Sequence, residues 1–344
     1  MIVTKGIKLK SFLSWTGPHY LWLLGLMSGI ASLYREGYIS FIIPWLPISV
    51  IGTAVAFYVG FKNNQAYDRM WEARKIWGGI VNDSRTWGMM IDGFVTTHFT
   101  DTKVSDSEID ETKKRLIYRH IAWLYAHRSQ LLISTEWEHA SQGGHVGRTA
   151  KMYQKKFGVG LIDDDVTLTE LTRFLPEVEY KRLIAHANTA TQIINEQSRD
   201  LKALREKNLI EDFRHMELMG VLRSFYEFQG KNERIKKFPL PRQYANISRI
   251  FVGVFIALLP FSMIPELMKL DELGFWLSIP ITALIGWVYV MMEIVGDYTE
   301  NPFQGMANDI PMLSLCRVIE IDLREMLGET DLPPSIESVS GVLM

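Results

Sequence analysis

Long apolar stretches without charged side chains alternate along this chain with stretches in which apolar and charged residues are mixed. Residues 38–61, 250–265 and 273–292 contain no Lys, Arg, Asp or Glu. The same holds for residues 11–34, where Pro18 moves the expected start of an apolar helix towards residue 20. A helix needs about 20 mostly apolar residues to cross the hydrocarbon core of a membrane. The pattern predicts four transmembrane helices, at approximately 18–35, 38–61, 249–266 and 273–294.

The rest of the chain has the pattern of soluble helices. Apolar residues recur at helical spacing in "DETKKRLIYRHIAWLYAHRSQLLI" and over residues 167–228. The segment "ISTEWEHASQGGHVGRTAKMYQKKFGVG" is predicted to be irregular because it contains several glycines. No repeat and no alternating strand pattern appears. We predict an all-α membrane protein whose transmembrane helices continue into a helical cytosolic region, residues 62–248, with a C-terminal segment over 297–344.

The distribution of basic residues predicts the orientation. Segments 5–10, 62–75 and 231–249 are rich in Lys and Arg, whereas the loops between the paired spans offer only Arg35 and Lys269. Because short cytoplasmic loops carry the excess of basic residues, both termini are expected in the cytoplasm. The N-terminal apolar stretch lacks a small-x-small cleavage site, so we expect it to be retained.

Composition and charge argue against several functional classes. The formal net charge is −2, with 37 basic and 39 acidic residues, so nothing favours nucleic acid as a partner. The single cysteine, Cys316, excludes an internal disulfide and a multi-cysteine metal site. His120 and His127 lie seven apart without a ligand set and are expected to be surface residues. We expect neither an enzyme nor a bound metal or cofactor.

Small residues recur every four positions in the second apolar stretch, at Gly52, Ala56 and Gly60. Such a stripe allows another helix to approach closely, and we assign these residues to helix packing.

A second row on the same helix contains Thr53, Phe57 and Phe61, again four apart, and ends at the polar run from Lys62 to Gln65. Phenylalanines in a membrane helix commonly face lipid or a packed core. If several copies surrounded an axis, the row would instead form a dry collar that opens into a polar vestibule. Such a collar gates ions by dewetting, because an ion inside it loses its hydration without gaining ligands.

Charged residues follow in the same helix, from Asp68 to Lys75, interleaved with Trp71, Ile76 and Trp77. Acid and base side chains lie three or four residues apart, as in a solvated helix face stabilised by ion pairs. We assign these charges to the scaffold.

The run "FKNNQAYDRMWEARKIWGGIVNDSRTW" resembles the signature of the bestrophin family in its bacterial form. Two further stretches are similar to the family pattern: "ERIKKFPLPRQYA", before the third span, and "GWVYVMMEIVGDYTENPF", at the end of the fourth. The matching residues are Asn63, Asn64, Tyr67, Arg69, Trp71, Glu72, Arg74, Trp77, Gly78, Pro239, Pro241, Trp287, Glu293, Asn301, Pro302 and Phe303.

The resemblance implies a homopentameric ion channel in the bacterial inner membrane, in which residues 1–344 form a single bestrophin-like unit around one central pore. It places a hydrophobic neck at Thr53, Phe57 and Phe61, which coincide with the row described above. It also implies a second, cytosolic aperture made by an apolar residue on a helix near 205–225, and Ile210 is the best match. The partners implied are further copies of the chain, membrane lipid and permeating monovalent ions.

Two acidic positions bear on ion binding. Calcium-gated animal members follow Asn-Pro-Phe with a run of acidic residues, whereas this chain reads "NPFQGMANDIP" and retains only Asp309. Because Ca²⁺ needs six to eight oxygen ligands, we expect calcium-independent activity. Glu293 is expected to be satisfied by a neighbouring helix, with a role as an ion ligand as the alternative.

Three functional hypotheses remain open from the sequence. The first is a channel for chloride or other small anions, which we favour. The second is a sodium-type, monovalent-cation channel of the same fold, since the row at Thr53, Phe57 and Phe61 carries no charge. The third is a membrane-anchored helical scaffold that conducts no ions and whose phenylalanines face lipid.

Overall fold

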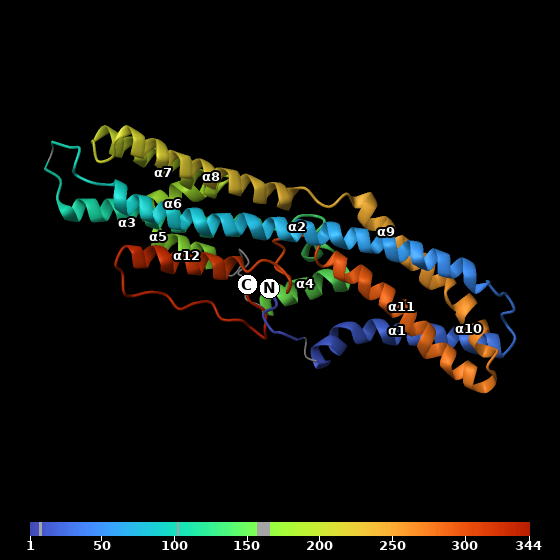
Figure 1. Cartoon of the computed structure of the whole chain (residues 1–344). Helices are drawn as coiled ribbons and strands as arrows, with labels where there is room; N and C mark the ends of the chain where they lie inside the picture. The colour runs from blue at the N-terminus through green and yellow to red at the C-terminus, as the bar shows by residue number, and fades with distance from the viewer. Residues whose placement is uncertain (7–8, 102, 157–165) are drawn as a thin grey trace. The chain divides into compact units, whose positions relative to one another are not determined.

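The computed structural model describes residues 1–6, 9–101, 103–156 and 166–344, so two positions of the basic segment 5–10 lie outside the described residues. Helices make up almost all of its regular structure, and the described residues contain isolated β-bridges but no strand. The all-α prediction is confirmed. The α-helices, labelled in Figure 1, are α1 (Leu9–Arg35), α2 (Trp45–Phe94), α3 (Asp106–Leu132), α4 (Gly144–Lys156), α5 (Val166–Phe174), α6 (Glu177–Ile184), α7 (Thr189–Glu206), α8 (Asp212–Lys237), α9 (Arg242–Leu258), α10 (Pro260–Met268), α11 (Asp271–Asp297) and α12 (Met312–Met326). A short 3-10 helix, η1 (His139–Ser141), lies between α3 and α4.

The chain forms two compact units. Unit 1 contains residues 1–3, 70–238 and 302–344, and unit 2 contains residues 4–69 and 239–301. Helix α2 contributes its first half to unit 2 and its second half to unit 1.

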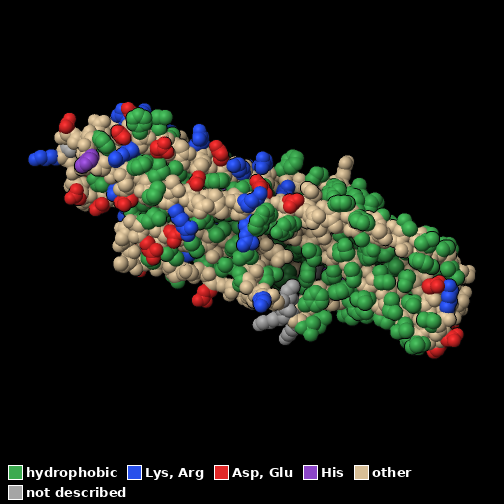
Figure 2. All heavy atoms as spheres, viewed as in Figure 1, with side chains coloured by type: hydrophobic (Ala, Val, Ile, Leu, Met, Phe, Trp, Pro, Cys, Tyr) green, Lys and Arg blue, Asp and Glu red, His purple; other side chains and the backbone are tan. Residues whose placement is uncertain are grey.

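Unit 2 is built from α1, the first half of α2, and α9 to α11. Helix α1 packs along α11, and the core that joins the helices includes Leu23 from α1, Val59 from α2 and Phe255 from α9. Hydrophobic side chains cover most of the face of this unit that Figure 2 shows. A surface of this kind is suited to lipid rather than to water.

Three helical stretches among the described residues are long and apolar enough to cross a membrane: Trp45–Phe94, Arg242–Met268 and Asp271–Asp297. Helix α1 is not among them; its first half contains Lys10, Pro18 and His19 as well as apolar residues. It nevertheless packs on α11 and leaves Leu21, Leu26 and Leu33 exposed. The first of the four predicted spans remains a prediction.

Prolines shape two of the apolar stretches. Helix α2 begins at Trp45, directly after Pro44, whereas the predicted span began at residue 38. Pro47 lies in the first turn, where its missing N–H costs no helical hydrogen bond. The third apolar stretch is divided at Leu259 into α9 and α10, and Pro260 begins α10.

Unit 1 surrounds α3, which packs against α5, α7, α8 and α12. Ser105 caps α3 by accepting a hydrogen bond from the Glu108 N–H at 3.2 Å. His120 and His127 are fully buried on this helix and stack on either side of Trp123, so the prediction that they lie at the surface was wrong. Burial lowers the pKa of His120 to about 3 and that of His127 to about 4, which keeps both rings neutral.

The segment predicted to be irregular contains a helix, α4. The turn before it approaches the helix so closely that a Cβ on Gly147 would lie 1.9 Å from the Gln142 carbonyl oxygen. Glycine is therefore required at this position for packing, and it does not interrupt the helix.

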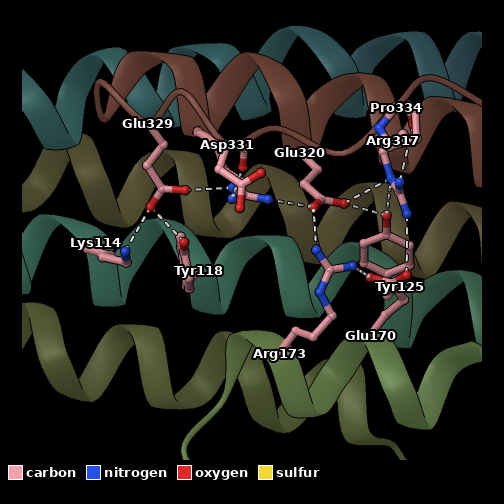
Figure 3. A network of polar contacts seen from close by, with 11 residues as sticks. Lys114, Tyr118, Tyr125, Glu170, Arg173, Arg317, Glu320, Glu329, Asp331 and Pro334 are labelled. Carbon is pink, nitrogen blue, oxygen red and sulfur yellow. Dashed lines mark hydrogen bonds and ion pairs between the residues drawn. The ribbon is translucent and has the colours of Figure 1, made fainter.

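A network of polar contacts joins α3, α5 and α12 in unit 1 (Figure 3). The Glu320 carboxylate is fully buried, accepts a hydrogen bond from the Tyr125 hydroxyl at 2.7 Å and pairs with Arg317 at 3.1 Å. Arg324 extends the network to Glu329 at 2.6 Å, just after α12. The network fixes the segment that follows α12 against α3.

The stability of unit 1 should fall in acid because of Glu329. Burial raises the pKa of this carboxyl, but hydrogen bonds from Lys114, Tyr118 and Arg324 outweigh it and lower the pKa from 4.5 to about 2. A lowered pKa stabilises the fold above the unfolded value, and this contribution is lost as pH falls from about 4.5 towards 2. Thermal unfolding should show Glu329→Gln to be destabilising at pH 7 and to approach the parent protein near pH 3. An equal difference at both pH values would contradict this assignment. Glu325→Gln, on the exposed face of α12, is the control.

Candidate functional site

Helix α2 has two distinct faces within unit 2. The buried positions recur at alternating spacings of four and three. The buried face packs on α9 and α11, whereas the described residues of unit 2 leave the opposite side exposed. The buried positions are Ile48, Gly52, Val55, Val59, Lys62 and Ala66, and the exposed ones from residue 49 onwards are Ser49, Val50, Thr53, Ala54, Phe57, Phe61, Asn64, Gln65, Tyr67 and Asp68.

The three predicted neck residues lie on the exposed side of α2. Phe57 is 65% exposed and Phe61 is 63% exposed. Thr53 is also exposed, and its hydroxyl donates to the Ser49 carbonyl oxygen of its own helix at 2.9 Å. With this bond made, the row presents two phenyl rings and a threonine methyl group.

Of the three small residues Gly52, Ala56 and Gly60, Gly52 is the one in close contact with neighbouring helices of unit 2. A Cβ on Gly52 would lie 2.8 Å from the Phe255 ring, and the Tyr289 hydroxyl donates to the Gly52 carbonyl oxygen at 3.0 Å. Ala56 is half-buried, and a Cβ on Gly60 would have no described atom within 4 Å. Gly52 therefore serves packing within unit 2, while Gly60 leaves room beside the phenyl row.

A buried polar cluster lies on the packed side of α2, one residue after Phe61. The Lys62 ammonium group donates to the Glu293 carboxylate of α11 at 2.5 Å, and the Ser248 hydroxyl of α9 donates to its other oxygen. The Lys62 and Glu293 side chains are 1% and 8% exposed. Glu293 is thus satisfied by neighbouring helices. Sequence reasoning treated Lys62 only as a juxtamembrane charge, although its spacing from Val55 and Val59 places it on the buried face.

The family-motif residues after Lys62 divide between packing and exposed positions. Asn63 donates to the Met292 carbonyl oxygen at 2.9 Å, and Trp77 is fully buried and stacks with His127. Glu72 pairs with Lys75 at 3.0 Å on the helix surface. The exposed motif residues of α2 are Asn64, Tyr67, Trp71, Arg74 and Gly78, and Arg69 is half-buried.

The remaining motif residues lie before α9, within α11 and directly after α11. Pro241 precedes the first residue of α9, and Pro239 lies two residues earlier. The Trp287 indole N–H donates to the Thr16 carbonyl oxygen of α1 at 3.2 Å. Asn301 is buried after α11.

The loop that begins Pro302-Phe303 is held by Asp309. Phe303 is buried with a left-handed φ of 71°, and its N–H donates to the Asp309 carboxylate at 2.9 Å. The Gly305 and Ile310 N–H groups donate to the same carboxylate, each at 2.7 Å. Burial raises the pKa of Asp309 despite these bonds. Within the described ranges, no three His, Cys, Asp or Glu side chains are arranged to hold a metal ion.

Ile210 lies in the turn between α7 and α8, and its side chain is 0% exposed. The helix expected at this position begins two residues later, at Asp212. Phe213, in the first turn of α8, is 78% exposed. The single chain thus buries the predicted aperture residue and exposes an aromatic residue close to it.

Comparisons with known proteins agree on the family. Residues 17–325 match the family profile of the bacterial/fungal bestrophin proteins. The voltage-dependent anion channel-forming protein YneE of Escherichia coli K12 is 24% identical over 337 residues, which cover 94% of each chain. The voltage-dependent anion channel-forming protein mll4386 of Mesorhizobium japonicum is 25% identical, over 84% of this chain and 77% of its own.

Solved structures agree on the fold. The crystal structure of a bacterial bestrophin homolog from Klebsiella pneumoniae superimposes with a TM-score of 0.71 at 22% identity, covering 91% of this chain and 98% of that one. Together with the family profile, which spans most of the chain, this likeness confirms the resemblance seen in the motifs. The chain belongs to the bacterial/fungal bestrophin family.

Proposed function

We propose that this chain is the subunit of an anion channel, with Thr53, Phe57 and Phe61 as the hydrophobic neck of a central pore. The observation that carries the proposal is the exposed row on α2, which runs from phenyl rings at Phe57 and Phe61 to polar side chains at Asn64 and Asp68. The same side of the helix becomes polar just beyond the rings, as a dry neck that opens into a hydrated passage requires.

A ring of identical subunits would give this row a function. Copies of α2 arranged around an axis would surround a narrow apolar passage at Phe57 and Phe61, with polar groups below it. Ions would cross only when water fills the passage, because the phenyl rings offer no ligands. Family membership favours five copies, embedded in the inner membrane with cytoplasmic termini and in contact with lipid.

The preference for anions rests on the relatives, two of which are named as anion channel-forming proteins. The family and these relatives favour a channel over an enzyme. A monovalent-cation channel of the same fold is the second candidate, because the row at Thr53, Phe57 and Phe61 has no charge that selects the sign of the ion.

The segment that carries Ile210 and Phe213 is proposed to form the cytosolic aperture. Ile210 supports the turn from the buried side, and Phe213 presents an exposed apolar ring three residues later. In this arrangement Phe213 would meet the permeating ion and Ile210 would hold the segment in place.

Replacing Phe57 with alanine should increase the ion current. Removing a phenyl ring widens the dry passage, and a barrier lower by about 1.4 kcal/mol corresponds to about a tenfold faster crossing. Single-channel recording in planar bilayers measures the change. Phe41→Ala is the matched control, because Phe41 is 63% exposed, close to the 65% of Phe57, but precedes α2. A non-conducting parent protein would favour the scaffold hypothesis, and equal currents in the parent and Phe57→Ala would remove Phe57 from the neck.

The sign of the reversal potential decides between anion and cation flow. With concentrated sodium chloride on one side of the bilayer and dilute sodium chloride on the other, the measured value should approach the chloride equilibrium potential. A value near the sodium equilibrium potential would instead establish the cation channel.

Calcium should not control the current. The Asp309 carboxylate is occupied by three backbone N–H groups, so it is poorly available to a cation that requires six to eight oxygen ligands. The open probability should be the same with added Ca²⁺ and with EGTA. A current that requires Ca²⁺ would show that another set of ligands operates.

A further inference from the structure

Lys62 and Glu293 form a buried ion pair within the helices of unit 2. The other ion pairs among the described residues of this unit have at least one partner that is substantially exposed, such as Arg35–Glu272 and Arg249–Asp297. Taking two charges out of water is costly, and each then needs its partner and further hydrogen bonds. Ser248 supplies one such bond to Glu293. The pair can therefore be satisfied in only a narrow range of helix positions.

Other polar contacts restrain the same part of α2. The Tyr58 hydroxyl donates to the Tyr244 carbonyl oxygen of α9 at 3.2 Å, and Asn63 donates to Met292 of α11. A Cβ on Gly296 would lie 1.9 Å from the Asn63 side-chain oxygen, so α11 and α2 approach closely here. The restraints at residues 58, 62 and 63 fix both the rotation and the height of the helix.

These restraints lie on the packed side of α2, away from the exposed phenyl row. Lys62 follows Phe61 in sequence, about 100° further round the helix, and its buried side chain is directed towards α9 and α11. Because α2 is continuous through this stretch, rotation or translation at residue 62 carries the Phe61 ring with it.

We propose that Lys62 and Glu293 are positioning residues for the neck: their ion pair holds α2 in the orientation that keeps Phe61 directed at the pore axis. This inference rests on the proposed function. Loss of the pair frees the back of the helix, so the phenyl rings leave their closed arrangement more often and the resting channel opens more.

The test is single-channel recording of Lys62→Met, Glu293→Gln and the charge-swapped double variant Lys62→Glu/Glu293→Lys, each purified as the assembled oligomer. Each single variant should raise the open probability by roughly threefold or more, and the swapped variant should return it towards the parent value. Glu272→Gln is the matched control, since it breaks the exposed pair with Arg35 at 3.1 Å and should leave the open probability unchanged.

Assembled single variants with the parent open probability would overturn the positioning role while leaving the channel intact. A parent protein that passes no current would overturn the proposed function, and this inference with it. If neither single variant assembles, Lys62→Arg decides the question. It keeps the charge but replaces the ammonium with a wider guanidinium group, so it should change the open probability of an assembled channel. An unchanged value would assign the pair to folding alone.

Discussion

The two opposite faces of α2 are the constraint on which the membrane part of this protein depends. One face must match the side chains of α9 and α11, which explains a glycine at position 52 and valines at positions 55 and 59. The other face is left exposed by the described residues and carries Phe57 and Phe61. Because helical geometry links the two faces, a change in packing on one side reorients the residues on the other.

Unit 1 follows a different rule, because its core contains many polar groups. Glu320, His120 and His127 are all buried, and each has a hydrogen-bonding or stacking partner that compensates for the loss of water. Asp309 acts similarly by accepting three backbone N–H groups from one loop. Polar contacts of this kind specify one arrangement of the helices more narrowly than apolar packing alone.

Periodicity and motifs in the sequence were sufficient to predict the all-α class, the family and the exposed row at Thr53, Phe57 and Phe61. They did not predict the burial of His120 and His127, because helical spacing gives a shared face but not what covers it. The α4 helix was missed because the requirement for Gly147 comes from a close approach of two backbone segments. Lys62 was assigned to the aqueous boundary because its partner, Glu293, lies 231 residues away in sequence.

The Lys62–Glu293 pair also constrains how this chain can diverge. Replacing either residue alone with an apolar one leaves the other side chain charged, buried and without its ion-pair partner. A substitution tolerated at one position therefore depends on which residue occupies the other. Exchanging both together for well-packed apolar side chains removes that penalty. Positions 62 and 293 should therefore show epistasis, and their residues should covary among descendants of a common ancestor.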